Sequence, residues 1–239
     1  MSKTPEHSPD ASANRRVQSF EFDSPLWWRK SGIWIVAIFA VVIFLMTQSP
    51  GGGGRKRAEQ IEAVNNARQI GLALSAFEEK YGKRPDLSTI AAVQQNAATS
   101  LNLGTKSSND FFRQLLASGI AQSEKMFYSQ STGTRKPDNI FTKAEALKKG
   151  ECGFTYFLGA IRTDNPLRPI AVTPMIPGTD RFDPKPFQGK AVVLRADNSV
   201  TSITILLRDG HAVIDGRNLM DPNHPIWDGH PPVIAWPDL

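Results

Sequence analysis

The chain has 239 residues, of which 40% are apolar, and it carries a formal net charge of +5. This length suffices for one folded domain of ordinary size with appendages. Lysines and arginines are scattered instead of forming a basic stripe interleaved with exposed aromatic residues, so the composition argues against nucleic-acid binding. A single cysteine, Cys152, excludes an intrachain disulfide and leaves the redox compartment open.

The N-terminal region divides into a polar tail and an apolar run. Residues 1–31 are rich in Ser, Pro, Asn and charge, and we expect a disordered tail. Residues 32–49 carry no charge and follow the aromatic and basic segment Leu26 to Lys30, which favours a transmembrane anchor. The anchor residues are Gly32, Ile33, Trp34, Ile35, Val36, Ile38, Phe39, Val41, Val42, Ile43, Phe44, Leu45 and Met46.

A cleaved secretory signal is the competing interpretation of the apolar run. The long, partly acidic leader and the lack of a small-x-small site before Pro50 argue against it. Basic residues flank the run on both sides, Arg29 and Lys30 before it and 55–57 after it, so charge alone does not set the topology. Pro50 and four glycines then predict a linker over 50–57 that interrupts any helix.

The segment from Glu59 to Tyr81 has the pattern of a long amphipathic helix. Apolar residues recur every three or four positions, which places them on one helical face, and polar residues occupy the opposite face. Gly82 and Pro85 are typical of a helix end. The expected packing face consists of Ile61, Val64, Ile70, Leu74, Phe77 and Tyr81.

The rest of the expected globular domain, 58–239, is predicted to combine short helices with strands. Leu87 to Gln95 is a possible helix, and Ser107 to Asp110 provide N-cap chemistry for a second one that stops at Gly119. Segments 190–195 and 200–206 predict a hairpin around Asp197 to Ser199, and a proline-rich tail is expected to wrap the surface.

These features resemble the type IV pilin and type II secretion pseudopilin family. The run Ala-Phe-Glu-Glu-Lys-Tyr-Gly-Lys-Arg-Pro-Asp over 76–86 is similar to the helix ending of that family, and the hairpin 193–200 is similar to its sheet. The resemblance implies an α+β fold in which a single N-terminal transmembrane helix leads into a long amphipathic helix packed on a small antiparallel sheet. It also implies a bacterial inner-membrane, single-pass protein with a periplasmic C-terminal domain.

The processing signature of that family is incomplete here. Arg29, Lys30 and Gly32 match the pattern before a cut between Gly32 and Ile33, but Ala37 stands where the family has an assembly glutamate. The resemblance therefore implies two functions. One is a subunit that acts by protein contacts in a secretion, pilus or envelope assembly, and the other is a tethered extracytoplasmic binding module that does not polymerise. An anchored, cytosol-facing enzyme or regulator is a third possibility.

The sequence contains no recognised catalytic or cofactor-binding pattern. It lacks a Gly-x-Ser-x-Gly motif, a phosphate loop and a dinucleotide fingerprint, so we expect no enzyme activity, no cofactor and no small-molecule substrate. Two sets of possible metal ligands have spacings that match no standard site, so we expect no metal. These sets are Asp209, Asp215, Asp221 and Asp228, and Cys152 with His211, His224 and His230.

Overall fold

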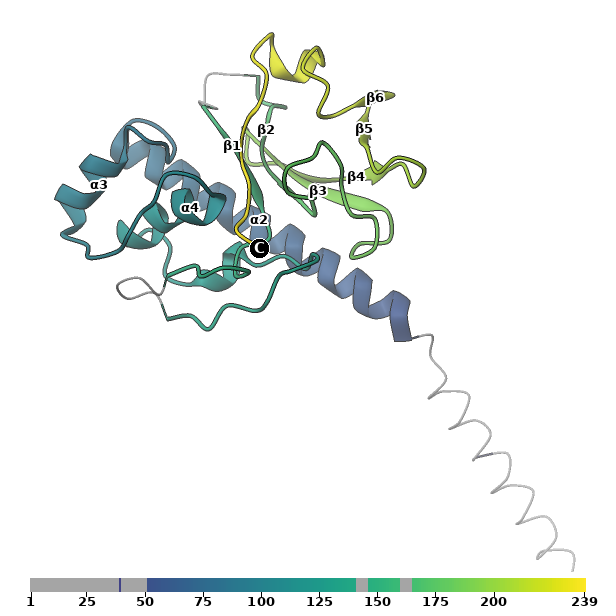
Figure 1. Ribbon diagram of the computed structural model, residues 1–239, viewed down its shortest axis with the longest axis horizontal. Helices are drawn as coiled ribbons and strands as arrows, with labels where there is room; N and C mark the ends of the chain where they lie inside the picture. Colours follow the sequence, from purple (N-terminus) through teal and green to yellow (C-terminus); the bar gives the residue numbers. More distant parts are fainter. Residues whose placement is uncertain (1–38, 40–50, 141–145, 160–164) are drawn as a thin grey trace, which may run out of the picture. The chain divides into compact units, whose positions relative to one another are not determined.

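The computed structural model describes residues 39, 51–140, 146–159 and 165–239 (Figure 1). The chain divides into two units, Met1–Ser49 and Pro50–Leu239. Phe39 is the one described residue of the first unit. The architecture below is that of the second unit.

Helix α2, Gly51–Tyr81, is the longest element of the second unit. It ends where the sequence predicts, because Gly82 adopts the left-handed conformation (φ 80°) and its amide donates to the carbonyl of Glu78 at 2.8 Å. Its beginning differs from the prediction. The four glycines belong to the helix, so 51–57 is not a separate linker.

Two shorter helices lie beside the C-terminal half of α2 (Figure 1). They are α3, Ile90–Ala97, and α4, Ser108–Ala117. The predicted N-cap of α4 is confirmed, since Ser107 and Asp110 form a reciprocal capping box. The 3-10 turn η1, Glu124–Phe127, then packs on α2, where the Asn66 amide donates to the carbonyls of Lys125 (3.1 Å) and Tyr128 (2.9 Å).

In the part of the chain that the structure describes, seven strands form one antiparallel sheet in the order β6-β5-β4-β3-β2-β1-β7. The strands are β1 (Thr155–Leu158), β2 (Pro169–Thr173), β3 (Lys190–Arg195), β4 (Val200–Ile205), β5 (Ala212–Ile214), β6 (Arg217–Asn218) and β7 (Val233–Ala235). The predicted hairpin is confirmed as β3 and β4. The 3-10 turn η2, Pro225–Trp227, precedes β7.

The central strands β1, β2 and β3 of the sheet are buried on both faces. Along β3, Val192 and Leu194 join a core with α2 and α4, whereas Ala191 and Val193 join a second core on the opposite face. This alternation follows from the two-residue period of a strand. The second core includes Trp227, whose Nε1 donates to the Leu219 carbonyl at 2.8 Å. The C-terminal segment therefore belongs to the core, and the expectation of a tail that only wraps the surface is wrong.

The expected fold, a transmembrane helix and a long amphipathic helix on a small antiparallel sheet, is wrong. The described residues of the second unit form three α-helices and a curled sheet of seven strands, not a small sheet carried by one helix. The extra strands β5, β6 and β7 are only two or three residues long. Such short strands leave too little alternation to be seen in the sequence.

The expectation of a membrane span is also corrected. No helix among the described residues combines the length and apolarity needed to cross a bilayer. Helix α2 carries Arg55, Lys56 and Glu59 in its first turns, and α3 and α4 have only 8 and 10 residues. The predicted anchor, Gly32 to Met46, lies outside the described residues except for Phe39. No described helix supports the single-pass, inner-membrane and periplasmic assignment.

The packing of α2 generates a matched pair of substitutions. Leu74 is fully buried, whereas Leu72 on the same helix is 66% exposed. We expect Leu74→Ala to lower the free energy of unfolding by about 3 kcal/mol, because a cavity forms between α2 and the sheet. The control, Leu72→Ala, should change it by less than about 0.5 kcal/mol. Urea unfolding of the full chain measures both, and equal losses would contradict this packing.

Candidate functional site

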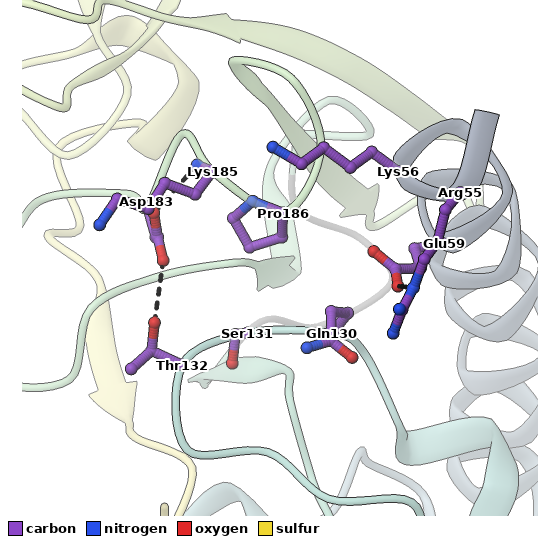
Figure 2. A pocket seen from close by; sticks show the side chains of 9 residues that line it. All are labelled: Arg55, Lys56, Glu59, Gln130, Ser131, Thr132, Asp183, Lys185 and Pro186. Atoms are coloured by element: carbon purple, nitrogen blue, oxygen red, sulfur yellow. Dashed lines mark hydrogen bonds and ion pairs between the residues drawn. The ribbon is translucent and has the colours of Figure 1, made fainter. Parts of the chain in front are cut away.

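A surface pocket of about 450 Å³ lies at the first turns of α2 (Figure 2). Three segments surround it: the start of α2, the segment after η1, and the loop between β2 and β3. Its residues are Arg55, Lys56, Glu59, Gln130, Ser131, Thr132, Asp183, Lys185 and Pro186.

The two acidic groups of the pocket are engaged within it. Glu59 pairs with Arg55 at 2.9 Å, one helical turn away. Asp183 accepts a hydrogen bond from the Thr132 hydroxyl at 3.0 Å, which ties the two loops together, and a second one from the backbone N–H of Lys185 at 2.9 Å. The negative charges are therefore turned toward groups of the protein itself.

Two lysines of the pocket keep their charge available. Lys56 and Lys185 are exposed, and neither forms an ion pair with another residue in the part of the chain that the structure describes. Both also line a neighbouring pocket of about 480 Å³. That pocket adds Lys190, whose Nζ donates to the Thr204 hydroxyl at 3.0 Å, and Leu207, which is 77% exposed.

We call these adjoining pockets the basic surface and define it by Arg55, Lys56, Lys185, Lys190 and Leu207. Side-chain hydrogen bonds hold its segments in place. Gln188 donates to the Gly53 carbonyl at 3.1 Å, and Gln60 donates to the Ser202 hydroxyl at 3.0 Å. The described lining of both pockets contains no histidine or cysteine. The basic surface therefore offers the cationic side chains of lysine and arginine beside the apolar side chain of Leu207.

A second group of polar side chains comes from the start of η1 and from the segments between η1 and β1. Glu124, Asp138 and Glu151 each place a carboxylate oxygen within 4.8 Å of the others. Glu124 and Glu151 are buried, and Asp138 is exposed. Burial raises the pKa of the Glu124 carboxyl, and the carboxylates of Glu151 and Asp138 raise it further. The ammonium of Lys148, 2.9 Å from Asp138, lowers the pKa of that carboxyl.

The predicted packing face of α2 is only partly the buried face. Ile70, Leu74 and Phe77 are fully buried, and Val64 and Tyr81 are partly buried. Ile61 is 55% exposed, so its assignment to the face is wrong. The buried face instead begins with Ala63 and Ala67, whose small side chains have a weak apolar signal but allow neighbouring segments to approach closely. The possible processing site at Gly32 and Ile33 lies outside the described residues.

The structure gives local roles to histidines that the sequence raised as possible zinc ligands. His211 Nε2 lies 3.1 Å from Asp180, and His224 Nδ1 accepts the backbone N–H of Ile226 at η2. Neither histidine belongs to the potential metal-binding group found among the described residues, which is the carboxylate group above. Sequence reasoning missed that group because its members, one in η1 and two in loops, are separated by 14 and 13 positions.

No protein-family model, no curated protein and no solved structure matches the chain. The resemblance to the type IV pilins and pseudopilins stays an untested prediction. The descriptions as pilin-like, pseudopilin or type II secretion protein are withdrawn together with the membrane span, because nothing in the comparisons or in the described helices supports them.

The environment of Cys152 predicts an unreactive thiol. Complete burial raises its pKa to about 11, and its sulfur lies 3.6 Å from the Ser108 hydroxyl. At pH 8 roughly one thiol in a thousand would be ionised, and only the thiolate attacks a disulfide reagent. We expect no measurable reaction of the native full chain with Ellman's reagent over minutes, and one equivalent in guanidinium chloride. Rapid reaction of the native protein would contradict this burial.

Proposed function

We propose that this protein is a non-catalytic binding module that acts through protein contacts, and that its basic surface takes an acidic segment of a partner protein. This keeps the part of the sequence-based hypothesis that concerns a module which does not polymerise. The membrane tether and the periplasmic location are not part of the proposal.

The observation that carries the proposal is that Lys56 and Lys185, which have no ion-pair partner among the described residues, are shared by two adjoining pockets. Their charges face solvent, whereas Glu59 and Asp183 are engaged by protein groups. A carboxylate-bearing segment would complement this charge and would bind with a strong dependence on salt.

Two features favour a protein segment over a nucleic acid as the partner. The exposed side chain of Leu207 lies next to the lysines and offers an apolar contact that a phosphate backbone does not use. The acidic residues Glu59 and Asp183 line the same pocket as the lysines, which breaks the continuous positive track that a nucleic acid prefers. The described lining offers cationic side chains and hydroxyls but no histidine or cysteine. This composition supports binding in preference to catalysis.

A peptide titration tests this function. A fluorescein-labelled peptide of alternating Glu and Leu residues should bind the full chain, with affinity that falls as salt rises. Combining Lys56→Glu with Lys185→Glu should weaken binding by about tenfold or more, because two attractive charges become repulsive. Lys106→Glu, which changes an exposed lysine before α4, is the matched control and should leave the affinity close to that of the unmodified chain.

Two further probes separate the alternatives. A peptide of alternating Lys and Leu should bind weakly, and so should a single-stranded oligonucleotide of similar charge. Tighter binding of the oligonucleotide than of the acidic peptide would overturn the assignment of a protein partner. Equal weakening by the double substitution and by the Lys106 control would show that the basic surface is not the binding site.

A further inference from the structure

Three segments converge between η1 and β1. Glu124 begins η1, Asp138 lies in the following loop, and Glu151 lies four residues before β1. Asn139 helps to fix this geometry, since its side-chain oxygen accepts the backbone N–H of Glu124 at 2.9 Å. Carboxylates so far apart in the sequence meet only because these loops fold onto one another.

The three carboxylates lie within the largest separation that ligands of one cation can have. Their oxygens lie within 4.8 Å of one another, and two oxygens each about 2.4 Å from a calcium ion are at most about 4.8 Å apart. Two of the three residues, Glu124 and Glu151, are almost completely buried, at 0% and 1% exposed. The group therefore differs from a chance gathering of acidic side chains in solvent.

A second observation comes from the individual oxygens of Glu124. Its Oε1 accepts the backbone N–H of Leu147 at 2.6 Å. Its Oε2 is buried and has no hydrogen-bond partner within the described part of the chain. A buried carboxylate oxygen without a donor is costly, because it has lost its hydration and gained nothing in exchange.

The three carboxylates also differ in whether a cationic side chain lies beside them. Glu151 pairs with Arg135 at 3.3 Å, and Asp138 pairs with Lys148 at 2.9 Å. Glu124 has no cationic partner among the described residues, although two carboxylates lie next to it. A bound cation would satisfy the free oxygen and offset the mutual repulsion of the three groups.

We propose that Glu124, Asp138 and Glu151 form a binding site for a divalent cation, and that Ca²⁺ is the preferred ion. The donors are all oxygens, which suits Ca²⁺ better than zinc, whose usual ligands include histidine and cysteine. Mg²⁺ holds its water shell more tightly and is seldom bound by several protein carboxylates at once. The bound ion would link η1, through Glu124, to the segments that carry Asp138 and Glu151.

Calorimetry and thermal unfolding of the full chain test the site. After treatment with a chelator and dialysis, titration with CaCl₂ should show one site with a Kd of about 0.1–1 mM. Saturating Ca²⁺ should raise Tm, because the ion binds the folded state alone. MgCl₂ should bind more weakly, and KCl at matched ionic strength should not reproduce the shift.

Three variants make the test specific. Glu124→Gln should abolish Ca²⁺ binding, and Asp138→Asn should weaken it by about tenfold, since each removes one charged ligand. Asp138 is exposed, so its variant keeps the test decisive if Glu124→Gln fails to fold. The control is Glu79→Gln, which neutralises an exposed acid on α2 and should leave binding unchanged.

Specific outcomes would overturn the proposal. The site does not exist if millimolar Ca²⁺ gives neither heat nor a change in Tm. If KCl at matched ionic strength raises Tm as much as CaCl₂ does, the increase comes from screening of the repulsion between the carboxylates and not from a bound ion. If Glu124→Gln raises Tm in chelator while the unmodified chain ignores Ca²⁺, Glu124 is a protonated core residue instead of a ligand.

Discussion

The contact between α2 and strand β3 is the constraint on which the rest of the second unit depends. Leu74 and its neighbours on α2 share one core with Leu194. The approach is close at Gly71, because a β-carbon added there would lie 2.9 Å from Leu194 Cδ1 and 3.1 Å from Asn198 Oδ1. A larger residue at this point would require the ends of the Leu194 and Asn198 side chains to shift. The absence of a side chain at Gly71 therefore allows these two side chains to lie directly against α2.

The end of α2 extends the same constraint to the sheet. Arg84 is buried, lies 3.3 Å from Glu78 and donates to the Ala196 carbonyl at 3.0 Å, so the turn after the helix is tied to the end of β3. The Tyr156 hydroxyl donates to the Pro85 carbonyl at 3.2 Å and ties the turn to β1. With this end fixed, the first turns of α2 project toward the β2–β3 loop, where the basic surface is formed.

The sequence allowed prediction of features that depend on neighbouring residues. The helix end at Gly82, the cap at Ser107 and the β3–β4 hairpin each follow from a local pattern. Features that depend on distant segments could not be predicted. The basic surface joins Lys56 to Lys185 across 129 positions, and the exposure of Ile61 shows that spacing alone does not tell which part of a helix meets the sheet. The resemblance also led to the prediction of a small sheet, whereas the observed sheet has core residues on both faces of its central strands.

The central claim is that α2 and the sheet open as one cooperative unit. Amide hydrogen exchange of the full chain, followed by mass spectrometry, measures the free energy of opening separately for 66–77 in α2 and for 190–195 in β3. The account predicts that both segments are strongly protected and that their opening free energies agree, because neither surface can be exposed without the other. Exchange of 66–77 within seconds while 190–195 stays protected would contradict the account.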